Sequence, residues 1–307
     1  MPDVLLAPKL SPLYVPQVEA EFTPHREITA DNAAKIRAVA CGGESKVPGE
    51  QIAQLPALEI ISVMGVGYDG VDVQAAKARG IMVTHTPDVL NDDVADVAIG
   101  LMLCAARQFP QANEYVHSGG WLKGPMPLQR KMSGARLGLV GMGRIGQAIA
   151  KRALGFGMQV AYHSRTAKAD LPYRFHADLR DLARESDFLV VITPGGAGTL
   201  KMINAEVLEA LGKKGILVNV ARGSVVDEAA LIDALQKGVI GGAGLDVFEN
   251  EPNVPQALRD MPHVVLTPHV GSATAQTRKA MADLAMDNLR AHFAGQPVKT
   301  PVPECRA

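Results

Sequence analysis

Short apolar runs alternate with longer segments of helical periodicity along the whole chain. The runs end at glycine, proline or asparagine, and the apolar positions between them recur about every three to four residues. Parallel β-α-β units are typical of this alternation, because each buried strand needs a crossover helix before the next parallel strand. The pattern therefore predicts an α/β fold built from doubly wound parallel sheets.

The first third of the chain predicts one small domain. The expected strands are residues 4–7, 38–41, 60–64 and 81–84, and the expected helices are 31–35, 49–55 and 73–79. A long helical pattern then runs from Asp92 to about His117. Asn91 is a suitable N-cap for it, and Asp92 and Asp93 suit the positive end of the helix dipole. Such a helix is long enough to bridge two domains.

A loop rich in glycine and proline, residues 117–133, precedes a second set of elements. Strands are expected at 136–141, 159–163, 188–193, 215–220, 242–247 and 263–267, with helices such as 146–153, 205–211 and 228–237 between them. Six strands suit a dinucleotide-binding sheet. The last helix, from residue 273 to about 293, is long enough to leave that sheet, and the polar tail from Gly295 is expected to return to the first domain.

Length and composition limit the classes of partner that this protein is expected to bind. The length of 307 residues is about twice that of one typical domain, and 31 basic against 32 acidic residues leave no basic footprint for nucleic acid. The longest apolar stretch, 94–106, is too short to span a bilayer, and the N-terminus lacks the features of a secretory signal. The three cysteines form no C-x-x-C pair for a metal. We expect a cytoplasmic protein with no membrane, metal or nucleic-acid partner.

A glycine motif lies between an apolar strand and a helix. In G-x-G-x-x-G, Gly141 permits a tight turn, Gly143 lets the backbone approach a pyrophosphate, and Gly146 permits close packing of the helix on the strand. The helix N-terminus adds free N–H groups and a positive dipole. An ordinary glycine-rich turn is the alternative, but the strand before and the helix after favour dinucleotide binding.

The end of the next strand indicates which dinucleotide is bound. A site for NAD normally carries Asp or Glu about 20 residues beyond the glycine motif, whereas Ser164, Arg165 and Thr166 stand here. A hydroxyl and a guanidinium suit a 2′-phosphate, because arginine makes charge-assisted bidentate bonds and no carboxylate repels the phosphate. We therefore expect NADP(H) to be favoured over NAD(H); the alternative is that Arg165 is a solvated turn residue.

Three charged side chains follow three later strands: Arg222, Glu251 and His269. Ligands of an open parallel sheet bind at the carboxyl ends of its strands, so these residues are expected to meet beside the glycine motif. Arg222 would hold a carboxylate or polarise a carbonyl, His269 would donate a proton, and Glu251 would orient the imidazole and favour its charged form. Each alone has an ordinary structural explanation, but together they predict hydride transfer at a carbonyl beside a carboxylate.

Four motifs, in this order, resemble the D-2-hydroxyacid dehydrogenase family: Gly141-Met-Gly-Arg-Ile-Gly, Asn219-Val-Ala-Arg-Gly, Gly244-Leu-Asp-Val-Phe-Glu-Asn-Glu-Pro and Thr267-Pro-His-Val-Gly. The stretch Gly120-Trp-Leu-Lys-Gly-Pro-Met-Pro-Leu resembles the glyoxylate/hydroxypyruvate reductase branch. The resemblance gives Arg222, Glu251 and His269 the family's catalytic roles. It also implies a Rossmann dinucleotide-binding domain (98–282), a smaller flavodoxin-like substrate domain made from both chain ends (1–97 and 283–307), and a homodimer built around the interdomain helices.

Further site residues complete this prediction. Val66 and Gly67 lie in a glycine-rich loop after a strand, where their backbone N–H groups can face a substrate carboxylate, and this loop matches the family's substrate loop. By the resemblance, Asp246 contacts the nicotinamide carboxamide. Trp121 is either a core residue or an aromatic wall of the substrate pocket, in its own subunit or a partner's. The predicted cofactor contacts also include Arg144, Ile145, Thr193, Pro194, Val220, Ala221 and Gly271.

The expected activity is NADPH-dependent reduction of glyoxylate or hydroxypyruvate to the D-2-hydroxyacid, with His269 as the proton donor. A bulkier aryl-pyruvate such as hydroxyphenylpyruvate is an alternative substrate, because an apolar pocket discriminates only by ~1–3 kcal/mol per methylene. A dinucleotide-sensing, corepressor-like binding protein is the alternative from another class. The three charged residues and the absence of a basic patch argue against it.

Overall fold

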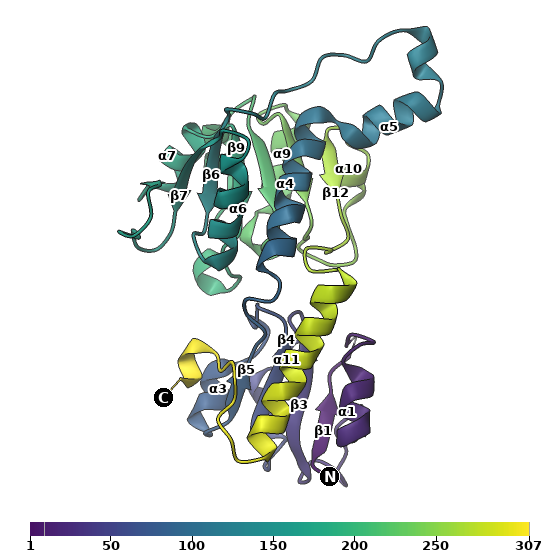
Figure 1. The fold of residues 1–307 in the computed structure, drawn as a ribbon, viewed down its shortest axis with the longest axis vertical. Coiled ribbons are helices and arrows are strands. Elements are labelled where there is room, and N and C mark those ends of the chain that lie inside the picture. The colour runs from purple at the N-terminus through teal and green to yellow at the C-terminus, as the bar shows by residue number, and fades with distance from the viewer. Residues whose placement is uncertain (9, 307) are drawn as a thin grey trace. The chain divides into compact units, whose positions relative to one another are not determined.

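The computed structural model describes residues 1–8 and 10–306 and divides the chain into two compact units (Figure 1). The terminal unit joins Met1–Leu90 to Ala273–Ala307, and the central unit is Asn91–Ser272. Both are α/β units with parallel sheets, which confirms the predicted fold class. The predicted boundaries at 97/98 and 282/283 lie inside helices α4 (Asn91–Arg107) and α11 (Ala275–Phe293). Helix α4 packs on β10, β11 and β12, and helix α11 packs on β4, so the division falls before each helix starts.

The terminal unit has a five-stranded sheet in the order β2-β1-β3-β4-β5, with every neighbouring pair parallel. This is the flavodoxin-like order that was expected. Its strands are β1 (Asp3–Leu6), β2 (Thr23–His25), β3 (Ile36–Gly42), β4 (Ile60–Met64) and β5 (Met82–Thr84). Its helices are α1 (Val15–Glu21), α2 (Gly49–Ala53), α3 (Val73–Ala78), α11 and the short 3-10 turn η4 (Pro303–Cys305). All five residues of β4 are buried, as in a strand covered on both faces.

Two features of this unit differ from the prediction. Helix α1 and strand β2 were not anticipated, and the expected helix at 31–35 is a run of turns. Asn32 explains the turns: its Oδ1 accepts the Thr29 N–H at 2.8 Å, and its Nδ2 donates to the Glu27 carbonyl at 3.0 Å. Local side-chain bonds of this kind compete with helix formation.

The C-terminal tail returns to the sheet of the terminal unit, as expected. The Val302 N–H donates to the Val83 carbonyl at 2.9 Å, and the His85 N–H donates to the Thr300 carbonyl at 3.1 Å. Val302 is fully buried in the core of this unit. The tail therefore holds β5 and the segment that follows it.

The central unit has a seven-stranded parallel sheet in the order β12-β11-β10-β9-β6-β7-β8. The six strands from β8 to β11 have the Rossmann order, in which the strand order reverses between β6 and β9, and β12 is an additional strand at the edge beside β11. Its strands are β6 (Arg136–Val140), β7 (Gln159–His163), β8 (Arg174–Phe175), β9 (Phe188–Val191), β10 (Ile216–Asn219), β11 (Gly242–Leu245) and β12 (Val264–Leu266). The six expected strands are present, and β8, with two residues, is the one that was missed.

Helices cover both faces of this sheet. The helices of the central unit are α4, α5 (Phe109–His117), α6 (Arg144–Leu154), α7 (Leu179–Arg184), α8 (Ala205–Leu211), α9 (Glu228–Gln236) and α10 (Gln256–Arg259), and all but α5 pack beside the sheet (Figure 1). Short 3-10 turns are η1 (Gly120–Lys123), η2 (Ala197–Thr199) and η3 (Gly223–Val225). Side-chain caps start three of these helices: Asp178 accepts the Arg180 N–H in α7, Asn204 accepts the Val207 N–H in α8, and Asp227 accepts the Ala230 N–H in α9. In the part of the chain that the structure describes, no helix has the length and apolar character to cross a membrane.

The single helix expected from Asp92 to His117 is two helices. Helix α4 begins at Asn91 itself and ends at Arg107, and Gln108 takes a left-handed conformation with φ of 48° before α5 begins. Pro110 accounts for the break, because it has no N–H and its ring clashes with the carbonyl four residues earlier in a continuous helix. Helix α5 and the loop after it extend away from the sheet of the central unit (Figure 1).

Candidate active site

The glycine motif lies at the reversal point of the central sheet, in the turn between β6 and α6. Gly141 has φ of 108°, and a Cβ there would lie 2.8 Å from the Ile192 carbonyl oxygen. A Cβ on Gly146 would lie 2.5 Å from the Gly141 carbonyl oxygen, whereas one on Gly143 would meet nothing within 4 Å. The first and last glycines thus close the turn, and the middle glycine leaves its outer face open.

This turn fits the pyrophosphate of a dinucleotide. Gly143 is the N-cap residue of α6 and has no side chain that could occupy the free N–H groups of the first turn. Arg144 and Ile145 begin the helix, so the positive end of the helix dipole faces the open side of Gly143. Thr193 and Pro194 follow the neighbouring strand β9, which places them beside the same turn.

The turn after β7 carries the residues predicted to distinguish the two dinucleotides. The Ser164 hydroxyl donates to the Thr166 carbonyl at 2.7 Å, and the Lys168 N–H donates to the Tyr162 hydroxyl at 2.7 Å, which folds the turn back on its own strand. Arg165 and Thr166 are exposed. None of residues 164–169 is acidic, so none of them would repel a phosphate.

Glu251 and His269 form a hydrogen-bonded pair at the carboxyl ends of β11 and β12. His269 Nδ1 lies 2.8 Å from Glu251 Oε2, and Glu251 Oε1 accepts the Phe248 N–H at 2.9 Å. Burial by itself raises the pKa of the Glu251 carboxyl. The hydrogen bonds from His269 and Phe248, with the positive charges of His269 and Arg222, outweigh that effect and hold the pKa below its usual value. The ionised carboxylate favours a proton on Nδ1 and leaves Nε2 as the atom that can exchange a proton.

Asp246 holds the loop that carries His269. Its buried carboxylate accepts the Val270 N–H and the Thr267 hydroxyl on Oδ1, at 2.8 and 2.6 Å, and the Gly271 N–H on Oδ2 at 2.8 Å. The Asp246 carbonyl accepts the His269 N–H at 2.9 Å. His269 has φ of 52°, a conformation that costs a non-glycine residue ~1–2 kcal/mol. These bonds offset that cost.

Arg222 follows β10, which lies next to β11. Its Nη1 donates to the Ala221 carbonyl at 2.8 Å, and Val220 and Ala221 before it are buried. Gly223 comes so close to the Phe248 backbone that a Cβ would lie 1.9 Å from the Phe248 carbonyl carbon. Only glycine allows this approach, and it brings the Arg222 turn against the loop that carries Glu251.

The structure therefore brings Arg222, Glu251 and His269 together, at the carboxyl ends of three neighbouring strands. Asn219 pairs with Leu245 across β10 and β11, and Leu245 pairs with Leu266 across β11 and β12, so the three strands end level. A cation, a carboxylate and an imidazole at one sheet edge can bind an anionic substrate and donate a proton to it. The supporting bonds of Asn219 and Asp246 at this edge were not predicted from the sequence. The signal that could have indicated them is the polar residue at the end of each apolar strand.

The predicted substrate loop lies at the carboxyl end of β4 in the terminal unit. The Thr86 N–H donates to the Gly65 carbonyl at 2.8 Å, and His85 Nδ1 lies 3.0 Å from the Val66 carbonyl. The Tyr68 ring packs edge-on against His85, and its hydroxyl donates to Glu304 in the C-terminal tail at 3.1 Å. Val66 and Gly67 thus belong to a loop in which hydrogen bonds hold the Gly65 and Val66 carbonyls and packing holds the Tyr68 ring.

Trp121 lies in η1, beyond α5, and 69% of it is exposed. The alternative that it is a core residue of its own chain is therefore wrong, because a single Gly/Pro-rich segment offers no second layer to cover it. Neighbouring apolar side chains are exposed as well: Leu122 at 94% and Leu128 completely.

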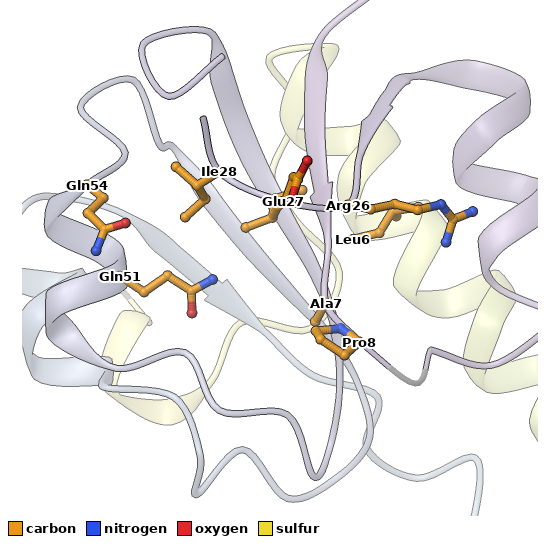
Figure 2. A pocket seen from close by; sticks show the side chains of 9 residues that line it. Leu6, Ala7, Pro8, Arg26, Glu27, Ile28, Gln51 and Gln54 are labelled. Carbon is orange, nitrogen blue, oxygen red and sulfur yellow. The ribbon is translucent and has the colours of Figure 1, made fainter. Parts of the chain in front are cut away.

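A pocket of the terminal unit lies away from the predicted site residues. This pocket has a volume of about 310 Å³ and lies at the carboxyl end of β1. Figure 2 shows Leu6, Ala7 and Pro8 on one side of it, and Gln51 of α2 and Gln54, which follows α2, on the other. None of the predicted site residues lines it.

Comparison with known proteins identifies related chains. Residues 99–271 match the model of the D-isomer specific 2-hydroxyacid dehydrogenase, NAD binding domain. The chain is 48% identical to the hydroxyphenylpyruvate reductase of Plectranthus scutellarioides, over 90% of this chain and 88% of that one. It is 49% identical to glyoxylate/hydroxypyruvate reductase A of Arabidopsis thaliana, over 87% and 85% of the two chains.

A solved structure is similar over the whole chain. It is the NADPH-dependent glyoxylate/hydroxypyruvate reductase of Sinorhizobium meliloti in complex with NADP and malonate, with a TM-score of 0.94 and 48% sequence identity. The alignment covers 100% of this chain and 99% of that one.

Proposed function

Because the chain belongs to the D-isomer specific 2-hydroxyacid dehydrogenase family, we propose that it reduces glyoxylate or hydroxypyruvate to the D-2-hydroxyacid with NADPH. It is an NAD(P)-dependent oxidoreductase of the glyoxylate/hydroxypyruvate reductase branch. The observation that carries the finer proposal is the Glu251–His269 pair beside Arg222, at the edge of the sheet that also holds the glycine turn.

The proposed chemistry assigns one role to each residue of this edge. The bound nicotinamide cofactor supplies a hydride to the carbonyl carbon of the substrate. Arg222 binds the substrate carboxylate and polarises the carbonyl with its planar set of donors. As negative charge develops on the carbonyl oxygen, the Nε2–H of His269 donates its proton to that oxygen, and the imidazole becomes neutral. The Glu251 carboxylate holds the ring by Nδ1 and stabilises its charged form before the transfer.

The preference for NADPH is supported by the turn after β7. Ser164, Arg165 and Thr166 supply hydroxyls and a guanidinium where a carboxylate would exclude a 2′-phosphate. The similar enzyme of Sinorhizobium meliloti is named as NADPH-dependent. We assign Gly141, Gly143 and Gly146 to the pyrophosphate and Asp246 to the nicotinamide end of the site. The remaining predicted cofactor contacts are Arg144, Ile145, Thr193, Pro194, Val220, Ala221 and Gly271.

A bulkier aryl-pyruvate is the second candidate substrate. The observation in its favour is the 48% identity to a hydroxyphenylpyruvate reductase. Of the two substrate classes, we favour small 2-oxoacids, because glyoxylate reductases recur among the relatives. They include the enzymes of Arabidopsis thaliana and Pyrococcus horikoshii. In either case the backbone N–H groups of Val66 and Gly67 receive the substrate carboxylate.

We also propose a homodimer that covers the exposed apolar arm formed by α5 and the loop after it, residues 109–128. Phe109, Val116, Trp121, Leu122 and Leu128 all lie on this arm and are exposed in the single chain. A run of large exposed apolar side chains on one extended segment is typical of a protein–protein interface. In the dimer, Trp121 serves as an aromatic wall of a substrate pocket.

Initial rates test the proposal. NADPH and, separately, NADH would be oxidised with glyoxylate, hydroxypyruvate, pyruvate and 4-hydroxyphenylpyruvate, with Arg222→Ala as the control. The proposal expects the fastest turnover with NADPH and a small oxoacid. A preference for the aryl acid would keep the mechanism and change the substrate, whereas tight cofactor binding without turnover on any of the four would favour the sensing role over catalysis.

A further inference from the structure

Asn219, the last residue of β10, is a polar residue buried to 99%. Its Oδ1 accepts the Ala221 N–H at 3.0 Å, and its Nδ2 donates to the Arg222 carbonyl at 3.0 Å. Its own carbonyl accepts the Asp246 N–H at 3.0 Å. One side chain therefore bonds both ends of the peptide segment that leads from the sheet to Arg222.

The turn from Asn219 to Arg222 needs these bonds. Strand pairing ends with the Val220 N–H, which donates to the Val191 carbonyl at 3.2 Å. Beyond it, the buried Ala221 N–H has Asn219 Oδ1 as its acceptor. The Arg222 carbonyl accepts a second bond, from the Val225 N–H at 3.2 Å, so Asn219 and the turn η3 hold it from two sides. Buried backbone groups that lose a partner are costly, so the chain would rearrange without the amide.

The turn is also confined on its outer side. The close approach of Gly223 to the Phe248 backbone leaves no space in that direction. The backbone at Arg222 is therefore held between Asn219 on the inside and Phe248 on the outside, and the Arg222 side chain extends from this fixed point. Its Nη1 then donates to the Ala221 carbonyl, in the same peptide segment that Asn219 holds.

We propose that Asn219 is a positioning residue that sets where the Arg222 guanidinium meets the substrate. The inference rests on the proposed role of Arg222 in substrate binding. Asn219 is buried and makes its side-chain bonds to this segment, so it acts through the Ala221–Arg222 peptide. Displacement of a positioned group by about 1 Å can cost roughly 100-fold in rate, so the loss of the amide should have an effect on catalysis beyond its effect on folding.

A double-mutant cycle tests this role. kcat and KM for hydroxypyruvate with saturating NADPH would be measured for the natural chain, Asn219→Ala, Arg222→Ala and the double variant. We expect Asn219→Ala to lower kcat/KM by about 10- to 100-fold, with the Kd of NADPH unchanged within about twofold. In the Arg222→Ala background the same substitution should have almost no further effect, because the group that it positions is gone. The Kd of oxamate, a carboxylate analogue of the substrate, gives the same cycle without turnover.

Two further variants separate positioning from folding. Asn204→Ala removes an asparagine bond to a backbone N–H in the same unit, at the N-cap of α8, and should leave kcat/KM unchanged. Asn219→Ser keeps a short acceptor for the Ala221 N–H but cannot reach the Arg222 carbonyl. If Asn219→Ala does not fold, Asn219→Ser should give the same pattern, with a loss that disappears in the Arg222→Ala background.

Different results would overturn different claims. An equal loss of kcat/KM from the Asn219 substitution with and without Arg222 would show that the residue acts through general packing, and would refute the inference. So would an Asn219→Ser or Asn219→Ala variant with natural kcat/KM. If Arg222→Ala itself kept natural turnover and oxamate binding, the proposed function of Arg222 would fail, and the inference would fail with it.

Discussion

Replacement of Glu251 by glutamine tests the proposed proton donor most informatively. In the structure the carboxylate accepts two bonds, from His269 Nδ1 at 2.8 Å and from the Phe248 N–H at 2.9 Å. A glutamine amide has one oxygen and one NH₂ group, so it can accept only one of these bonds through a carbonyl oxygen. Glu251→Gln therefore removes the negative charge beside the imidazole and also breaks one bond of the loop.

The size of the effect follows from the lost charge-assisted bond. Such a bond contributes about 1.5–3 kcal/mol, and each 1.36 kcal/mol corresponds to a factor of ten in rate. Reduction needs the imidazole in its charged form, and the carboxylate stabilises that form. Without the carboxylate, kcat/KM should fall by about 10- to 100-fold, and its decline at high pH should begin at lower pH. The carboxylate of the natural enzyme has a lowered pKa, so acidification protonates it only below its usual range.

The assay is kcat/KM for hydroxypyruvate with NADPH, measured over the pH range in which imidazole titrates. Glu249→Gln is the matched control: it removes a negative charge from the same loop, but its side chain is exposed, and the pH profile should not change. An unchanged profile and unchanged kcat/KM in a folded Glu251→Gln variant would refute the assignment of Glu251 as the partner of the proton donor.

Four further predictions concern other parts of the molecule. Arg165→Ala should weaken NADPH binding by roughly 10- to 100-fold, the loss of one charge-assisted contact, and NADH binding much less; equal losses in fluorescence titrations would contradict the NADPH preference. Gly143→Ala should fold normally and lose affinity for both dinucleotides, whereas Gly146→Ala should lower the Tm because its Cβ would press on the Gly141 carbonyl; the opposite order in calorimetry would count against the proposed glycine roles. Leu122→Asp should convert the dimer to monomers in light scattering without lowering the Tm, and a dimer of natural affinity would place the interface elsewhere. Glu304→Gln should raise the KM for the oxoacid a few-fold, with kcat and the Kd of NADPH unchanged, because it weakens the bond from Tyr68 that supports the Val66–Gly67 loop; an unchanged KM would argue against that support.

Buried strands were predictable because both of their faces are covered. In β4 and β9 every residue is buried, so the sequence shows an unbroken apolar run. Strands β2 and β8 lie at sheet edges and have two or three residues, with no buried side chain in either. Their pairing comes from the neighbouring strand rather than from their own apolar pattern, and this is why periodicity missed them.

The helix break and the false helix have local causes that periodicity alone does not weigh. Pro110 stands in the sequence as a visible helix breaker, but the apolar spacing continues on both sides of it and predicts one helix. At residues 31–35 the opposite occurs, since Asn32 ties its side chain to Thr29 and Glu27 and keeps the chain in turns.

Some features of the candidate site were also predictable from the sequence, and others were not. Arg222, Glu251 and His269 could be placed at one sheet edge from the sequence, because each follows a strand and parallel strands end together. The supporting bonds of Asn219 and Asp246 could not, because they depend on how the chain turns after the strand. The positive φ of His269 and the contact of Gly223 with Phe248 arise only when neighbouring loops pack.

The central claim is that this sheet edge catalyses reduction of a 2-oxoacid. The most direct test is kcat/KM for NADPH-dependent reduction of hydroxypyruvate by the natural chain, compared with His269→Ala, with the Kd of NADPH measured on both. A positioned proton donor contributes about 10²- to 10⁴-fold, so we predict a loss of that size with unchanged NADPH affinity. Natural turnover by a folded His269→Ala variant would contradict the claim.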